Sequence, residues 1–167
     1  MNTIAVDKLM SETRRLAALF RANTGSVLPV SAELGRYDAA KLLHLKPLKE
    51  PMKGVDFLGT LGAYAGKKIL VKSRVVFEEG KSGCRIGQLN IDSPWEYVSL
   101  VLYTAQYQPF EIYGAAKKDV VDTLDKMSSS RRQRGMMSLA KFKVISQLLW
   151  TPEFGIEWDD IWTNQKA

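Results

Sequence analysis

GVDFLG at residues 54–59 and GKKILVKSRVVF at residues 66–77 are two strand-like segments joined by a short link. The first predicts a short strand over 55–58 that carries Asp56. Polar and apolar residues alternate in the second, as in a strand whose two faces meet different surroundings. The alternation predicts that one face carries Ile69, Val71, Val75 and Phe77. The other face carries Leu70, Lys72, Arg74 and Val76. The pattern predicts a β-sheet with a lysine in the middle of one strand.

Amphipathic helical patterns precede this strand pair. The periodicity predicts a helix over 6–22, ended by the Asn-Thr-Gly sequence at 23–25, and a second helix over 32–45 with Ser31 as its N-cap. An amphipathic helix turns its apolar side toward the core. In the first helix that side consists of Leu9, Thr13, Leu16 and Phe20. Residues 46–53 contain two prolines and are interpreted as a loop.

Further strands and then helices follow along the chain. The expected strands cover residues 85–91, 97–103 and 110–113. Helices are expected over 117–127 and from Ser138 onward, the latter with an inner face that includes Leu149. The order of elements predicts one α+β (α/β) domain over 1–152, with a central mixed sheet of about five strands flanked by helices. Residues 153–167 are expected to form an acidic, aromatic tail.

The charge of the chain is uneven. Its 167 residues carry a net charge of +6, with 46% hydrophobic and 25% charged residues. Residues 1–152 hold 23 Lys/Arg and 14 Asp/Glu, whereas the last fifteen hold one base and four acids. A basic body favours a polyanionic partner such as nucleic acid. The alternative is a generally basic protein without such a partner.

Several other classes of function lack sequence support. The single cysteine, Cys84, permits neither an internal disulfide nor a cysteine zinc site, and the single histidine, His44, excludes a multi-histidine metal site. We expect a cytoplasmic protein without a membrane partner, because the start has no leader pattern and the longest apolar run, 97–105, is far shorter than a bilayer span. Phosphate-loop and dinucleotide-binding glycine motifs are missing from the sequence.

Asp56, Lys72 and Arg74 suggest phosphodiester chemistry. Hydrolysis of a phosphodiester needs an activated water and a cation that offsets phosphate charge, and a carboxylate-bound divalent metal supplies both. Two positions separated by one residue on a strand share a face, so an acid-x-lysine pair would point both groups into one cavity. Here Leu70 stands where the acid would be, and it cannot bind a metal. The alternatives are that Asp56 is a turn residue and that the two cations are solvated.

The order of several short motifs resembles a known superfamily. The motifs are SAEL at 31–34 with AAKLL at 39–43, GVD at 54–56, LVKSR at 70–74, WEYV at 95–98, and KFK at 141–143 leading to Trp150. Their order resembles the PD-(D/E)XK nucleases, and in particular a bacterial branch with a Gly-x-Asp and Gln-x-Lys core. The resemblance implies a restriction-endonuclease-like fold over roughly residues 30–150.

The resemblance also implies roles for individual residues. Asp56 would be a ligand of Mg²⁺ or Mn²⁺, Lys72 the catalytic lysine, and Glu33 a helix-borne acid that supports the metal. The chain departs from the branch at Leu70, where the branch carries Gln or an acid, and at Ser73, where it often carries Gly. The first departure predicts a weakened metal site.

A second cluster of basic residues lies late in the chain. The expected contacts to nucleic acid, together with Arg74, are Arg131, Arg132, Arg134, Lys141 and Lys143. The last two fall near the start of the expected helix at Ser138, where backbone amides attract anions. The alternative is a solvated linker. The tail over 153–167 either completes the core or shields the basic face.

These observations predict a protein that binds nucleic acid, with DNA the expected form. The first expectation is a nuclease-like fold with a weakened, Mg-dependent phosphodiesterase site. The alternative is a catalytically inactive scaffold or accessory subunit of a restriction or defence system. A homodimer or a protein partner is left open, and an enzyme of unrelated chemistry has no residue constellation behind it.

Overall fold

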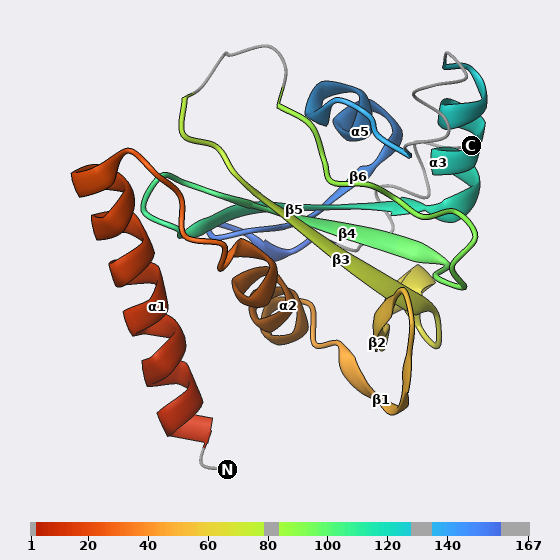
Figure 1. Ribbon diagram of the computed structural model, residues 1–167. Helices are drawn as coiled ribbons and strands as arrows, with labels where there is room; N and C mark the ends of the chain where they lie inside the picture. Colours follow the sequence, from red (N-terminus) through yellow and green to blue (C-terminus); the bar gives the residue numbers. More distant parts are fainter. Residues whose placement is uncertain (1–2, 79–83, 128–134, 158–167) are drawn as a thin grey trace.

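The computed structural model describes residues 3–78, 84–127 and 135–157 of the chain (Figure 1). The helices are α1 (Thr3–Thr24), α2 (Ser31–Leu42), the 3₁₀-helix η1 (Gly62–Tyr64), α3 (Lys117–Asp125) and α5 (Leu139–Ile145). The strands are β1 (Lys46–Met52), β2 (Val55–Leu58), β3 (Lys68–Val75), β4 (Tyr97–Tyr103), β5 (Pro109–Ala116), β6 (Gln147–Thr151) and β7 (Gly155–Ile156).

The described strands form one mixed sheet whose spatial order follows the sequence from β1 to β7. Neighbouring strands are antiparallel except β3 and β4, which run parallel from Ile69 opposite Tyr97 to Val75 opposite Tyr103. Parallel neighbours need a crossover, which is usually a helix. Here the described residues of the crossover, 76–78 and 84–96, contain no helix. The expected α+β class is confirmed, with seven strands instead of about five.

Each face of the sheet has its own apolar core, and Figure 1 shows α1 and α2 on one side and α3 and α5 on the other. The α3/α5 face buries Trp95 of the crossover with Leu100 of β4 and Phe142 of α5. The α1/α2 face buries other residues of the sheet, among them Ile69 and Tyr103. The alternation expected for β3 is confirmed, because its odd-numbered apolar residues face α2 and Leu70 faces the opposite core.

The prediction of a loop over 46–53 was wrong, because Lys46–Met52 forms strand β1. It lies at the edge of the sheet, and an edge strand tolerates prolines because one side of its backbone needs no partner. Gly54, with φ of 80°, makes the tight turn into β2. The prolines and glycine of this segment therefore suggested a loop where β1 and β2 form a hairpin.

Three other local predictions need correction. Residues 85–91 form only an isolated bridge between Arg85 and Ser138 instead of a strand. Leu149 lies on β6, because α5 ends at Ile145 and the chain continues as a strand. Ser31 is the first residue of α2 and not its cap, and its carbonyl accepts a hydrogen bond from the Ser73 hydroxyl at 2.7 Å. The cap expected at Ser138 is confirmed, since its hydroxyl accepts the N–H of Lys141.

Helix α1, Thr3–Thr24, is longer than the expected helix over 6–22 and has the opposite orientation. The side with Leu9, Leu16 and Phe20 was expected to be buried, yet these side chains are 66%, 52% and 37% exposed. The helix instead turns Ala17 inward, with Arg14 beside it. The prediction failed because it assumed that the most apolar side of the helix faces the core, whereas a buried ion pair decides the orientation.

That ion pair joins Arg14 of α1 to Asp38 of α2. The Arg14 guanidinium donates to both carboxylate oxygens of Asp38, which is 4% exposed, and also to the carbonyl of Tyr107 at 3.0 Å. The Tyr103 hydroxyl donates to Asp38 at 2.5 Å. Burial raises the pKa of Tyr103, which keeps this hydroxyl protonated as a donor. Two helices and the sheet are thus joined through one carboxylate.

Replacing Asp38 with Asn should destabilise the fold strongly. The substitution leaves the mostly buried Arg14 without its counter-ion, and breaking a buried pair in this way costs about 3–5 kcal/mol. Urea denaturation would measure the loss. The same change at exposed Asp122 on α3 is the control and should alter the free energy of unfolding by about 0.5 kcal/mol or less. Equal effects at the two positions would contradict the role given to Asp38.

Candidate functional site

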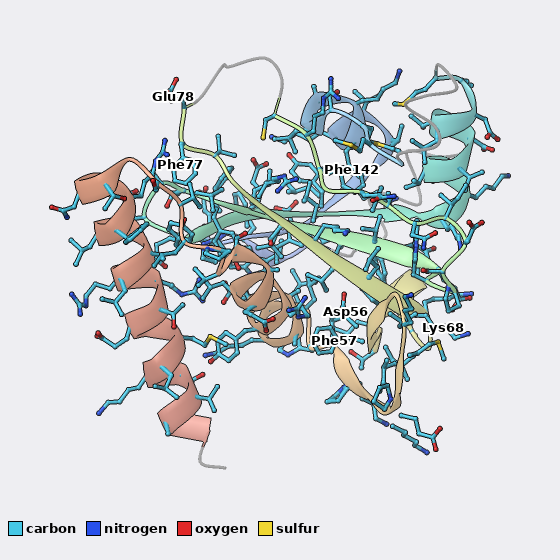
Figure 2. The ribbon with its side chains drawn as sticks, in the orientation of Figure 1. Asp56, Phe57, Lys68, Phe77, Glu78 and Phe142 are labelled. Atoms are coloured by element: carbon cyan, nitrogen blue, oxygen red, sulfur yellow. The ribbon has the colours of Figure 1, made fainter. Side chains whose placement is uncertain are left out.

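The candidate site forms where β2 leaves β3. The two strands pair through Phe57 opposite Ile69 and Leu58 opposite Lys68. At the next position the carboxylate of Asp56 points toward β3 and accepts the main-chain N–H of Val71 at 2.7 Å (Figure 2). A side chain thus replaces the strand partner that Val71 would otherwise have. Asp56 is therefore part of the sheet's hydrogen bonding as well as a candidate functional acid.

Helix α2 lies against β3 beyond this point. Gly35 permits the approach, because a Cβ at this position would lie 2.7 Å from the Cβ of Ser73. The hydrogen bond from the Ser73 hydroxyl to the carbonyl of Ser31 fixes the contact. This close approach brings Arg36, one residue after Gly35, near the cations of β3.

Lys72 and Arg74 lie on the α3/α5 face of β3, beneath the crossover that leads to β4. A Cβ at Gly87 would lie 3.8 Å from Lys72 Nζ and 3.6 Å from Arg74 Nη2. Arg74 also donates from Nε to the carbonyl of Arg85. The two cationic groups therefore lie next to each other and next to one glycine of the crossover.

Asp56 and Lys72 lie within electrostatic range of each other. Burial lowers the pKa of Lys72, the negative charge of Asp56 raises it, and the positive charges of Arg74 and Arg36 lower it further. The net direction is downward. The site therefore combines three cations with the carboxylate of Asp56 and with Glu33, which pairs with Arg36, so its local charge is positive.

The third expected catalytic residue, Glu33, has a different environment. Its side chain is 69% exposed and forms an ion pair with Arg36, one turn along α2. It lies on the rim of a groove of about 510 Å³ between α1 and α2, which Phe57 also lines. Leu70 packs against the core of the α3/α5 face. Within the described residues, no three His, Cys, Asp or Glu side chains are grouped so that they could hold a metal.

The late basic cluster is described in part. Arg131, Arg132 and Arg134 lie outside the described residues. Lys141 is exposed on α5, and Lys143 forms an ion pair with Glu111 at 3.5 Å. The carbonyl of Cys84 accepts the N–H of Leu139, and Leu89 donates to Gly135, so the segment that leads into α5 lies along the crossover. The start of α5 is thereby attached to the segment that covers Lys72 and Arg74.

Sequence reasoning missed Arg36 as a member of the site. Its signal was available, because Arg36 lies three residues after Glu33 and therefore on the same side of a helix. The position of Gly87 had no sequence signal, since it depends on the path of a crossover without regular structure.

Comparison with models of known protein families and with curated proteins finds no match. Among the described helices, none combines the length and the apolar character needed to cross a membrane. A functional assignment therefore depends on the chain's own residues and their geometry.

Two substitutions at Asp56 should separate its structural role from a metal-binding role. Asp56→Ala removes the acceptor for Val71 N–H and should cost about 1–3 kcal/mol of stability. Asp56→Asn keeps an acceptor oxygen and should cost clearly less. Thermal denaturation with and without Mg²⁺ would measure both effects. Stabilisation of the native chain by Mg²⁺ that is lost in Asp56→Asn would indicate instead that the carboxylate binds the metal.

Replacing Lys72 with Met should stabilise the protein at neutral pH. A lysine whose pKa is lowered in the folded state binds fewer protons there than in the unfolded chain, so its charge opposes folding below the folded pKa. That penalty diminishes as pH rises through the folded pKa toward the ordinary lysine pKa of 10.5. The gain from Lys72→Met should therefore shrink at alkaline pH in urea titrations. Arg74→Met is the control with a nearly constant effect, because arginine keeps its charge over this range.

Proposed function

We propose that this protein binds the sugar–phosphate backbone of a nucleic acid on a nuclease-like fold, without requiring a metal ion at the site. The observation that carries the proposal is that Lys72 and Arg74 lie side by side next to Gly87, with Lys72 also within electrostatic range of Arg36 and of the carboxylate of Asp56. Positive charge at a partly buried position attracts phosphate and repels a divalent cation. The basic character of residues 1–152 supports the same partner.

The hydrogen bonding of the acids supports binding over catalysis. One oxygen of Asp56 accepts a main-chain N–H, Glu33 pairs with Arg36, and Leu70 offers no ligand. Mg²⁺ usually retains only one or two protein carboxylates, but it needs their oxygens available and correctly placed. A bound phosphate, in contrast, would supply the negative charge that these cations lack.

The fold is compatible with a PD-(D/E)XK-like protein. A helix precedes the hairpin, Asp56 and Lys72 lie on neighbouring strands of a mixed sheet, and helices follow. The order of these helices and strands supports the resemblance to the superfamily. Leu70 and the crossover without a helix in its described residues are departures from the superfamily's pattern, and both favour a scaffold that retains binding.

A second candidate is a Mg²⁺- or Mn²⁺-dependent phosphodiesterase with a weakened site. The proximity of the Asp56 carboxylate to Lys72 favours it, since a lysine beside a metal-bound phosphate can stabilise developing charge. Asp56 would hold the metal, and Glu33 would support it only after leaving Arg36. A protein that binds nucleic acid without cutting it would serve as an inactive scaffold or as an accessory subunit of a restriction or defence system.

Salt-dependent binding tests the phosphate contacts directly. Fluorescence anisotropy with duplex DNA, single-stranded DNA and RNA should detect affinity that decreases as salt increases. Lys72→Gln, Arg74→Gln and Arg36→Gln should each weaken binding and reduce the slope of log K against log salt by about 0.9. Lys8→Gln on α1 is the control and should leave the slope unchanged. Equal slopes for all four variants would contradict the proposed site.

A cleavage assay in Mg²⁺ and Mn²⁺ separates binding from catalysis. We expect the native chain to bind nucleic acid without cutting it. If metal-dependent cleavage is gained in a variant, we expect that variant to be Leu70→Glu. Cleavage by the native chain that disappears in Asp56→Ala and Lys72→Ala would contradict the metal-independent proposal and support the phosphodiesterase.

A further inference from the structure

The groove of about 510 Å³ between α1 and α2 adjoins the candidate site. Arg36 lines this groove, and its charge also lowers the pKa of Lys72. Phe57 lines the groove as well and directly follows Asp56 on β2 (Figure 2). The groove and the cations of β3 are therefore neighbouring parts of one surface. Its volume is within the range of sites that bind small organic groups.

The walls of the groove are largely aromatic and apolar. Phe57 of β2 and Tyr37 of α2 contribute two rings, and Met10 of α1 and Ala40 of α2 complete the apolar part. All four residues are half-buried, so part of each side chain is accessible to a ligand. Accessible aromatic rings beside cationic groups are typical of proteins that bind single strands, because the flat face of every base can stack on a ring.

The charges that line the groove are already balanced within the protein. Glu33 pairs with Arg36, and Asp7 pairs with Lys41 at 3.4 Å. These two acids and two bases give the lining no net charge, in contrast to the excess of cations around Lys72. The groove therefore favours an uncharged group over a phosphate.

The hydroxyl of Tyr37 independently indicates a ligand. It is buried and has no hydrogen-bond partner among the described residues. Leaving a buried hydroxyl without a partner is unfavourable, so native proteins normally satisfy such a group. The Lys41 ammonium lies 5.7 Å from the centroid of the Tyr37 ring, which is near the outer limit of a cation–π contact. A base that stacks on this ring would thus displace only a weak contact.

We propose that the groove between α1 and α2 holds an unpaired base of the strand whose backbone lies at Lys72 and Arg74. The inference rests on the proposed binding of nucleic acid, and it adds that the bound form is single-stranded. Arg36 borders both regions, so a phosphate beside it brings the attached base to the groove. A duplex must first unstack and unpair that base, which costs free energy. Single strands of DNA and RNA share the chemistry that the groove requires.

Oligonucleotides without bases test the groove separately from the phosphate contacts. Fluorescence anisotropy of the full chain would compare a labelled single strand with a strand of equal length whose central nucleotides are abasic. Both strands have the same phosphates, so the slope of log K against log salt should be equal for the two. Loss of stacking should weaken binding of the abasic strand about tenfold. A duplex of the same sequence should also bind more weakly, and DNA and RNA strands tested in parallel would show which sugar is preferred.

Substitutions in the groove should affect only the strand that carries bases. Tyr37→Leu removes one ring and should weaken binding of the normal strand about tenfold, with the affinity for the abasic strand unchanged. Ala40→Met fills the groove from α2 and should have the same selective effect, so the test does not depend on one variant. Phe154→Leu is the matched control, because Phe154 is 70% exposed between β6 and β7 and should alter neither affinity. Circular dichroism would check that each variant is folded.

Equal affinity of the native chain for the normal and the abasic strand would overturn the inference, and so would tighter binding of the duplex. Native-like binding of the normal strand by folded Tyr37→Leu and Ala40→Met would overturn it as well. If Lys72→Gln and Arg74→Gln still weaken binding in these cases, the proposed function stands and only the base-binding groove is rejected. A native chain that binds none of the oligonucleotides would overturn both.

Discussion

The hydrogen bond from Val71 N–H to the Asp56 carboxylate determines where β2 separates from β3, and the candidate site exists because of that separation. Beyond this point α2 packs against β3, where Gly35 meets Ser73, and Arg36 follows directly after Gly35. One acid thus accepts the N–H of Val71 where β2 leaves β3 and, among the described residues, raises the pKa of half-buried Lys72 by its charge. The same carboxylate therefore has a structural and an electrostatic role.

This dual role explains how a nuclease-like arrangement can favour anion binding. A metal site needs carboxylate oxygens whose charge is available to the metal, and here the nearest oxygen already serves the backbone. Lys72, Arg74 and Arg36 carry three positive charges, which exceed the charges of Asp56 and of Glu33, the partner of Arg36. Restoring a ligand at Leu70 would introduce a carboxylate into a position that now packs against an apolar core, so it would also carry a desolvation cost. Metal binding and the packing of this face therefore oppose each other.

The sequence predicted those features that arise from short-range patterns. The alternation of β3, the buried strand β4 and the cap at Ser138 depend on neighbouring residues, and all three were found. Strand β1 was missed because edge position, a long-range property, overrides the turn preference of its prolines. The orientation of α1 was missed because Arg14 finds its partner 24 residues away, and a buried ion pair outweighed the helix's most apolar side. Arg36 belongs to the site because α2 approaches β3 closely at Gly35, and no periodicity in the sequence indicates that approach.

The parallel pairing of β3 and β4 also bears on how the chain folds. These two central strands are separated by the 21 residues of 76–96, and the described part of that connection has no local helix that could form first. Their alignment must therefore await closure of a long loop, which costs entropy before any ladder hydrogen bond forms. Until closure, two apolar strands have open edges. The rate-limiting event in folding should accordingly be the meeting of β3 and β4, and misassembly between chains should compete with it at high concentration.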